Sequence, residues 1–381
     1  MTSQYRIWSL LVRILFDPNS PGSNQELREK LIRDESFWQE VISMSNADLV
    51  TSELWTILRQ KQLEDCVSPN ALEYLESLNC LNINISKAVR DQALECIEAL
   101  NRAGIVPMPI KGVAYQLAAS GEDVLDRFLT DIDIMVPAES ASRAQEVLCE
   151  LDYRIVPSEI VDYGTHHHLE PMWRESGPVT IEIHRSAVPR ALESALPCAS
   201  IWKNASSESR NGIQFRLPSP TDSAMVVFLH NVMCDRCLSK CVVPLRSFLD
   251  ADRLQFLYGN VIDWDKNLGR ISKIGARSAF RRFAYIMYRL SGRKFVDDMQ
   301  FTRSDFLHYQ ICHLAEVRPA LADWAMRFER LSNHQLRKSY DVGESSLSIH
   351  AYRMREIGAM LMNGMNGIRR IKGLFHDTHR H

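Results

Sequence analysis

One strand-forming segment with two acids limits what this chain can fold into more than any other feature. In "TDIDIMV", Asp131 and Asp133 alternate with Ile132 and Ile134. Because alternate side chains of a strand point to opposite faces, the two carboxylates share one face and the two isoleucines share the other. The segment therefore predicts a strand whose apolar face is buried and whose two acids project into the same space.

A second segment further along the chain has the same alternation. In "VTIEIH", the polar face carries Thr180, Glu182 and His184, and the apolar face carries Val179, Ile181 and Ile183. Strict alternation of this kind is typical of a strand that is buried on one side only. Glu182 is therefore a candidate third acid beside the first two.

Helical patterns flank this strand-rich region. Residues 1–104 and 219–381 repeat apolar side chains at three- and four-residue spacing, which is typical of amphipathic helices. Between them, short strand candidates such as "IVPMPI" and "YRIV" alternate with short helix candidates such as "GVAYQLAAS". The pattern predicts an α+β or α/β fold with a small mixed sheet in residues 105–218, between an N-terminal and a C-terminal helical region.

The Asp-x-Asp spacing is not specific by itself. Asp250 and Asp252 have the same spacing, but they lie in a helical pattern, where residues two apart point about 200° from each other. Asp131 and Asp133 share a strand face, so they can bind one cation together or stand as solvated acids at a strand end. Two neighbouring carboxylates repel unless a cation offsets their charge, which favours the first interpretation.

Composition excludes several classes of protein. The chain has 45 Lys and Arg against 47 Asp and Glu, a formal charge of -2, so a partner as large as a long nucleic acid is not expected. No stretch approaches the roughly 18 apolar residues of a membrane-spanning helix. Nine cysteines are scattered through a chain long enough to fold without disulfides. A cytoplasmic enzyme with reduced thiols is the expectation.

The order of these motifs resembles a known family. A Lys-Gly step, a short helix, "RFLTDIDIMV" and an acid and a histidine in "IEIH" are similar to the polymerase-β-like nucleotidyltransferases, and most closely to a branch described only as putative nucleotidyltransferases. The resemblance covers residues 105–185 well and extends more weakly over residues 85–295. It implies transfer of a nucleoside monophosphate from an NTP to an acceptor, with release of pyrophosphate.

The resemblance also implies a role for individual residues. Mg²⁺ or Mn²⁺ would be held by Asp131, Asp133 and Glu182, and Glu182 could instead take the proton of the attacking acceptor. Contacts with the nucleotide would come from Lys111, Gly112, Arg127 and His184, with the start of the helix offering backbone amides to the phosphates. The NTP is a co-substrate in this interpretation.

Three positions depart from the family pattern. Gly112 is followed by Val113 where the superfamily has Gly-Ser or Gly-Gly, the third acid is Glu182 where aspartate is usual, and Arg185 stands where an aromatic residue is common. These departures keep open a protein of the same fold that binds a nucleotide or a partner without catalysis. Kinase-like transfer of the γ-phosphate is a further alternative, because the same metal ions support it.

The segment "HHHLEP" at residues 166–171 invites a metal site. Consecutive side chains of an extended segment point in different directions, so only His166 and His168 are expected to share a face. We therefore expect these two histidines, with Arg185, to line a pocket for the acceptor. The acceptor itself is expected to be a small molecule or a peptide, the latter because relatives are associated with peptide natural-product pathways.

Overall fold

The computed structural model describes residues 3–119, 126–157, 163–316 and 318. The chain divides into two compact units, one of residues 1–236 and 243–309 and one of residues 237–242 and 310–381. The first unit contains every candidate site residue. The three-part division at residues 104 and 218 stays a prediction, and the helical pattern of residues 319–381 lies outside the described residues.

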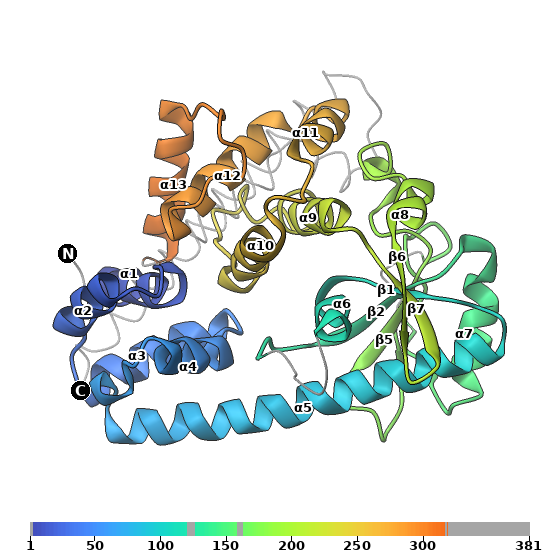
Figure 1. The fold of residues 1–381 in the computed structure, drawn as a ribbon, viewed down its shortest axis with the longest axis horizontal. Coiled ribbons are helices and arrows are strands. Elements are labelled where there is room, and N and C mark those ends of the chain that lie inside the picture. The colour runs from blue at the N-terminus through green and yellow to red at the C-terminus, as the bar shows by residue number, and fades with distance from the viewer. Residues whose placement is uncertain (1–2, 120–125, 158–162, 317, 319–381) are drawn as a thin grey trace, which may run out of the picture. The chain divides into compact units, whose positions relative to one another are not determined.

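The first unit contains a five-stranded mixed sheet (Figure 1). Its strands are β1 (Met108–Pro109), β2 (Asp131–Met135), β3 (Arg154–Ile155), β4 (Met172–Trp173) and β5 (Thr180–His184), in the order β1-β2-β5-β4-β3. Strands β2 and β5 are parallel, and the other neighbours are antiparallel. The predicted fold class, a small mixed sheet with helical flanks, is confirmed.

Helices precede and follow the sheet. The first group is α1 (Ser3–Phe16), α2 (Pro21–Lys30), α3 (Glu35–Ala47), α4 (Thr51–Gln60) and α5 (Pro69–Arg102). Within the sheet region lie α6 (Lys111–Ala118) and α7 (Ala141–Cys149), and after it come α8 (Cys198–Asn204) and the hairpin β6 (Ser206–Arg210) and β7 (Ile213–Leu217). The last group is α9 (Pro220–Phe228), a π-helical turn (Leu229–Cys234), α10 (Leu245–Tyr258), α11 (Trp264–Lys273), α12 (Arg277–Ser291) and α13 (Arg303–Glu316).

The apolar face of the sheet forms the core together with α5 and α7. The isoleucines of the two central strands are fully buried there: Ile132, Ile134, Ile181 and Ile183. Burial of each such side chain contributes about 1.5–3 kcal/mol, which fixes which face of each strand points inward. Helix α5 begins with Pro69 in its first turn and ends before Gly104, whose φ of +78° suits glycine. The opposite, polar face of β2 and β5 is left for the site.

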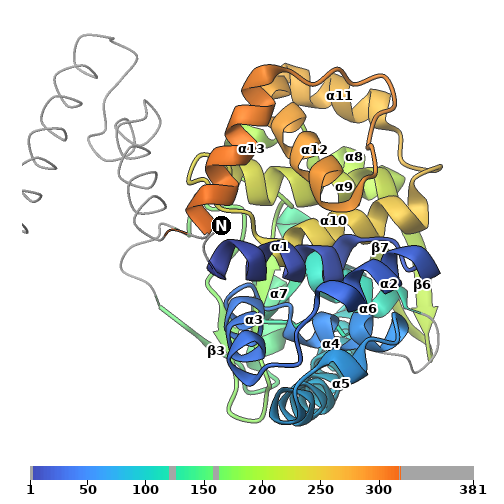
Figure 2. The same ribbon diagram turned by 90° about the vertical axis from the view of Figure 1, so that its left-hand side faces the viewer.

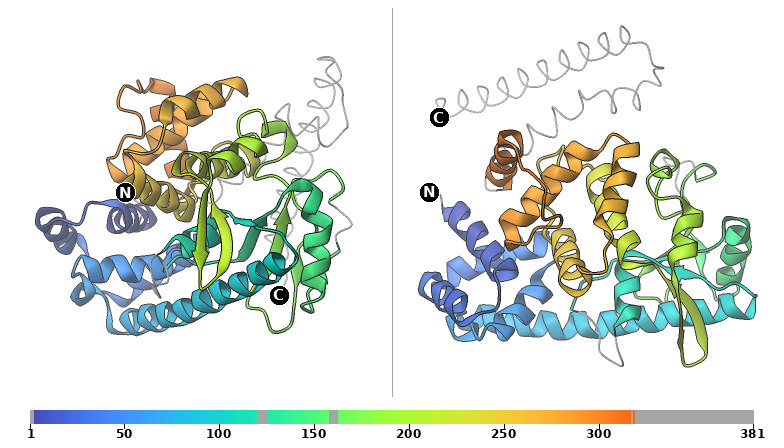
Figure 3. Two further views of the ribbon diagram at one scale, coloured as in Figure 1. Left: turned by 45° about the vertical axis from the view of Figure 1, so that its right-hand side comes forward. Right: turned by 45° about the horizontal axis from the view of Figure 1, so that its top comes forward.

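Helices α6, α9 and α10 lie beside that polar face. Helix α6 contacts β2 and α9, and α10 packs against α9, as Figure 1 shows. The N-terminal helices pack on one another and α1 contacts α12 (Figure 2). The β6–β7 hairpin runs alongside α5 (Figure 3). Among the described helices, none combines the length and apolar character needed to cross a membrane.

Candidate active site on the polar face of the central strands

The register of the two parallel strands brings the acids together. Asp133 of β2 lies opposite Glu182 of β5, and Asp131 lies opposite Thr180. One ligand atom from each of Asp133, Glu182 and His184 lies within 4.8 Å of the others. Asp133 and Glu182, which are far apart in the sequence, are therefore neighbours on the sheet, on the face that the alternation predicts.

Asp133 is the centre of a buried charge cluster. Its Oδ1 accepts hydrogen bonds from Lys111 Nζ at 2.8 Å and from His184 Nε2 at 2.7 Å. The Asp133 side chain is 2% exposed and His184 is 0% exposed. His184 Nε2 also lies 3.4 Å from Glu182 Oε2. Two positive groups thus balance a carboxylate that could not otherwise be buried as an anion.

The protonation states follow from this geometry. Burial alone would raise the pKa of Asp133, but the charges and hydrogen bonds of Lys111 and His184 hold it well below its usual range. For His184, burial alone would lower the pKa, but hydrogen bonds to Asp133 and Glu182 raise it. The hydrogen bond from His184 likewise outweighs burial and lowers the pKa of Glu182. Asp133 and Glu182 are therefore anionic near neutral pH, and His184 is held toward its imidazolium form.

Asp131 is in a different environment. Burial and the adjacent charge of Asp133 raise the pKa of Asp131, and they outweigh the charge of Lys111 and a hydrogen bond from Thr130, which lower it. A carboxylate that faces other carboxylates gains most from a divalent cation. The oxygen donors of Asp131, Asp133 and Glu182 match the preference of Mg²⁺ and Mn²⁺ for hard ligands. The residues present therefore fit such an ion, and the donors to Asp133 both use one of its two oxygens.

A cavity of about 160 Å³ opens beside these acids. Asp131, Asp133 and Lys111 line it on the sheet side, and the other wall comes from α9, the π-helical turn and α10, including His230, Asn231, Asp235, Arg246 and Ser247. The sequence interpretation missed this second wall. Its residues follow no motif, and the π-helical turn, a feature often found at functional sites, is not visible in the sequence pattern.

Arg246 is the cation of that second wall. Burial, together with the charge of nearby Arg127, lowers the pKa of the Arg246 guanidinium. Its hydrogen bond to the carbonyl of Phe128 is long, 3.5 Å. A partly buried arginine with so weak a partner retains donors for a bound anion.

Arg127 is engaged elsewhere. Its Nε and Nη2 donate to both oxygens of Asp250 at 2.8, 3.0 and 2.9 Å, and the two side chains are only 11% and 8% exposed. The guanidinium also lies against Gly112, where an added Cβ would come within 2.2 Å of Arg127 Nη1. The structure therefore places Arg127 as a tie between the sheet region and α10, and its predicted contact with phosphate stays a prediction.

The start of α6 faces the cavity with its backbone. Lys111 begins this helix with a φ of +56°, a conformation that costs non-glycine residues about 1–3 kcal/mol and that recurs at functional sites. No side chain caps the first turn. Val113, which replaces the usual small residue, is buried in the core. Backbone amides of α6 are thus available to an anion, whereas a side-chain hydroxyl at position 113 would point into the core.

The three consecutive histidines lie next to β5. One ring nitrogen from each of His166, His167 and His168 is within 4.8 Å of the others, so the ring of His167 lies in the same group as the two that are expected to share a face. The segment is a bend and not a continuous strand, and only His168 forms a β-bridge, with His184. Burial lowers the pKa of all three, that of His167 to about 2. They are neutral imidazoles near Glu182.

Arg185 has a structural contact in this region. Its Nη1 donates to the carbonyl oxygens of Tyr163 at 2.9 Å and His166 at 3.3 Å. These hydrogen bonds from Arg185 therefore hold the segment that carries the histidines in place. Its predicted place in an acceptor pocket stays a prediction, as does that of His166 and His168.

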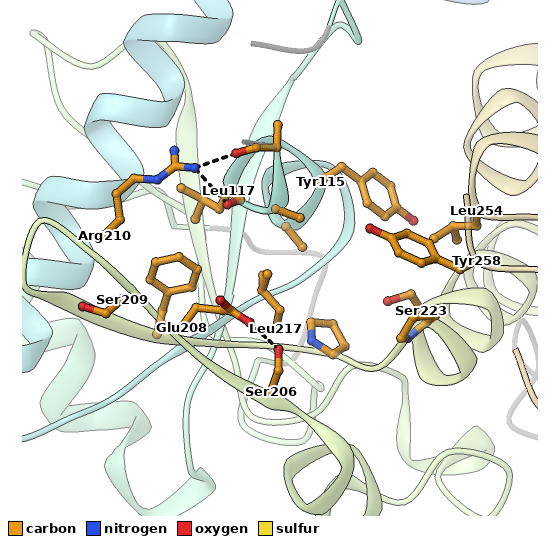
Figure 4. A pocket seen from close by; sticks show the side chains of 16 residues that line it. Tyr115, Leu117, Ser206, Glu208, Ser209, Arg210, Leu217, Ser223, Leu254 and Tyr258 are labelled. Carbon is orange, nitrogen blue, oxygen red and sulfur yellow. Dashed lines mark hydrogen bonds between the residues drawn. The ribbon is translucent and has the colours of Figure 1, made fainter. Parts of the chain in front are cut away.

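A larger cavity of about 430 Å³ lies at the other end of α6. Figure 4 shows Tyr115, Tyr258 and Leu254 on one side of it and Arg210 with residues of the β6–β7 hairpin on the other. Arg210 donates to the carbonyls of Leu117 and Ala119, which closes the C-terminal end of α6. Tyr115 lines both cavities, so the two lie on consecutive turns of the same helix.

A small mixed sheet whose parallel strands carry three acids beside a short helix is consistent with a nucleotidyltransferase core. The chain belongs to the family described as "Uncharacterised nucleotidyltransferase", whose sequence model matches residues 34–292. The match includes all of the candidate site residues and the α10 wall of the smaller cavity. No curated protein matches the chain.

The protonation state of His184 can be tested by its effect on the free energy of unfolding. Its folded pKa is above the unfolded value of about 6.5, so its contribution to folding is fully present below that pH and is lost as pH rises through the folded pKa. The difference in unfolding free energy between the wild type and His184→Gln should therefore shrink as pH increases. Urea unfolding at several pH values measures it. A difference that grows with pH would show that His184 is buried as a neutral ring.

Proposed function

We propose that this protein is a metal-dependent nucleotidyltransferase that moves a nucleoside monophosphate from an NTP to a hydroxyl or phosphate of a small-molecule or peptide acceptor and releases pyrophosphate. The observation that carries the proposal is the placement of Asp131, Asp133 and Glu182 on two paired parallel strands, with Asp133 close to Glu182 and with both aspartates lining a cavity that Lys111 and Arg246 also line. Family membership supports the class of reaction.

The acids would hold Mg²⁺ or Mn²⁺. When bound, such an ion neutralises the charge of the phosphates and orients them for in-line attack. In this proposal Asp131 and Asp133 are its principal ligands. Lys111 and His184 keep Asp133 ionised and fix its orientation before the substrate arrives.

The triphosphate would occupy the smaller cavity. The uncapped first turn of α6 presents backbone amides and the positive end of the helix, both of which favour anions. Arg246 faces it from α10. Lys111 adds a positive charge at the same end, and Gly112 lets Arg127 approach closely enough to join α10 to the sheet.

The acceptor would approach from the β5 side. Glu182 is anionic and half-buried, so it is suited to accept the proton of an attacking hydroxyl. The cavity of about 430 Å³ at the other end of α6, which shares Tyr115 with the smaller cavity, is large enough for the organic part of either substrate. The small net charge supports a compact acceptor over a long nucleic acid. A cytoplasmic location is part of the proposal, because no disulfide joins any of the nine cysteines.

One assay separates this function from the alternatives. The protein is incubated with Mg²⁺ or Mn²⁺, NTPs labelled at the α- or γ-phosphate, and a panel of hydroxyl and phosphate acceptors including peptides. Label from the α-position on an acceptor, with pyrophosphate in solution, supports nucleotidyl transfer. Label from the γ-position on an acceptor, with nucleoside diphosphate, indicates a kinase. Nucleotide binding without either product indicates a silent binding protein.

Replacement of Arg246 tests the proposed triphosphate site. Arg246→Met keeps much of the side-chain bulk and removes the charge, so NTP affinity should fall by about 10- to 100-fold, since a hydrogen bond to a charged group is worth about 1.5–3 kcal/mol. Isothermal titration with an NTP and Mg²⁺ measures the change. Arg289→Met, on α12 outside the cavity, is the control. Equal affinities for the wild type and Arg246→Met would remove Arg246 from the site.

A further inference from the structure

The histidine cluster has features of a ligand site that the proposed reaction does not use. The ring centroid of His166 lies 4.2 Å from that of His167 and 4.1 Å from that of His168. The ring centroids of His167 and His168 are 4.8 Å apart. Close contacts among three imidazoles leave several ring nitrogens facing one another. Lone pairs that face one another are stable only when a proton or a metal ion lies between them.

Two of these ring nitrogens are buried and form no hydrogen bond within the described part of the chain. The Nδ1 atoms of His166 and His167 find no hydrogen-bond partner among the described residues. Buried polar atoms are normally paired, so each such atom points to an absent partner. His168 differs, because its Nδ1 lies 2.7 Å from the carbonyl of Leu169 and donates to it. In the neutral ring its Nε2 therefore carries the lone pair, 3.7 Å from Glu182 Oε2.

The backbone holds this cluster in place. The amides of Arg185 and Ser186 donate to the carbonyl of His167 at 2.8 and 3.2 Å, and the amide of Leu169 donates to Ile183 at 2.8 Å. The Arg185 guanidinium binds two more carbonyls of the segment. Hydrogen bonds hold this backbone, and the three imidazole rings are already close together. The site is therefore preorganised, because little conformational entropy of the chain remains to be lost when an ion binds.

We propose that His166, His167 and His168 bind a divalent cation of the borderline class, such as Zn²⁺, at a site separate from the one that Asp131 and Asp133 form. Imidazole nitrogen is the donor that Zn²⁺ and its neighbours in the first transition row prefer, whereas Mg²⁺ prefers oxygen. Tetrahedral coordination at about 2.0–2.1 Å places ligand nitrogens about 3.4 Å apart, so small ring rotations close the present arrangement. Glu182 Oε2 lies 3.7 Å from His168 Nε2, so its negative charge would offset that of the ion.

The site is tested with the metal alone. The full chain is freed of metal with a chelator and titrated with Co²⁺, whose visible spectrum reports nitrogen coordination, and with Zn²⁺ in competition. One equivalent should give a Co²⁺ spectrum with imidazole ligands at low coordination number, and any ion at the acids should add only the spectrum of oxygen ligands. The result does not depend on nucleotidyl transfer, so failure of one proposal leaves the other standing.

Variants locate the ion. His166→Ala with His168→Ala should weaken binding by about 100-fold or more, because loss of ligands exceeds the 10- to 100-fold cost of losing a partner of a ligand. Asp131→Asn should leave the affinity unchanged. Circular dichroism checks that each variant is folded, and X-ray absorption of the Zn²⁺-bound wild type provides a test without variants. Oxygen-only coordination, unchanged affinity in the double variant, or loss of binding in Asp131→Asn would each overturn the proposal.

Discussion

Asp131→Asn is expected to abolish nucleotidyl transfer and leave the protein at least as stable as the wild type. The substitution removes one of the two principal oxygen ligands of the proposed ion, and loss of several kcal/mol of charge stabilisation corresponds to a rate about a thousandfold lower. Burial and the charge of Asp133 raise the pKa of Asp131 in the folded protein, so its anion opposes folding above that pKa. Asparagine removes this cost at neutral pH.

The measurement pairs turnover with Mn²⁺ affinity, so that the result does not depend on the choice of acceptor. Mn²⁺ binding is followed by electron paramagnetic resonance and stability by urea unfolding. Asp265→Asn, an exposed position on α11, is the matched control and should change neither quantity. Wild-type turnover and Mn²⁺ affinity in Asp131→Asn would remove this residue from the site. Asp133→Asn is a poorer test, because it removes the anion that balances the charges of Lys111 and His184.

Asp250→Ala is expected to destabilise the protein by about 3–5 kcal/mol. The substitution leaves the Arg127 guanidinium buried without its carboxylate, and an uncompensated buried charge has a cost of this size. Because the pair joins the loop before β2 to α10, the smaller cavity should also lose its α10 wall and NTP affinity should fall. Urea unfolding and isothermal titration measure the two effects.

Two controls bracket this result. Glu98→Ala removes an exposed ion pair with Arg102 on α5 and should cost no more than about 1 kcal/mol. Arg127→Met combined with Asp250→Leu removes both charges and should recover most of the stability, since a buried pair replaced by apolar side chains of similar volume is often neutral. If Asp250→Ala cost no more than Glu98→Ala, Arg127 would not depend on this partner.

The local pattern of the sequence was sufficient to predict the strands that carry the acids. The segments "DIDIM" and "TIEIH" form β2 and β5, and their isoleucines are buried as alternation requires. Burial on one face decides which residues point inward, so period-two patterns encode it directly. Gly104 ends α5 because its positive φ is available to glycine at little cost.

Contacts between segments that are distant in the sequence could not be predicted from local patterns. Arg127 and Asp250 are 123 residues apart, and the helical pattern around Asp250 does not indicate its partner. Which strands are parallel, and that α10 forms a wall of the cavity, depend on packing of whole elements. The expectation that His166 and His168 share a face without His167 rests on the geometry of a straight strand. The rule for a straight strand does not apply to a bend held by the Arg185 guanidinium.

The most direct test of the central claim does not require the acceptor. Crystals grown with Mn²⁺ and a non-hydrolysable NTP are examined by anomalous scattering at the manganese edge. The account predicts a manganese peak about 2 Å from carboxylate oxygens of Asp131 and Asp133, with the triphosphate at the first turn of α6. A nucleotide and its manganese bound elsewhere, with the acids contacted only by Lys111 and His184, would contradict it.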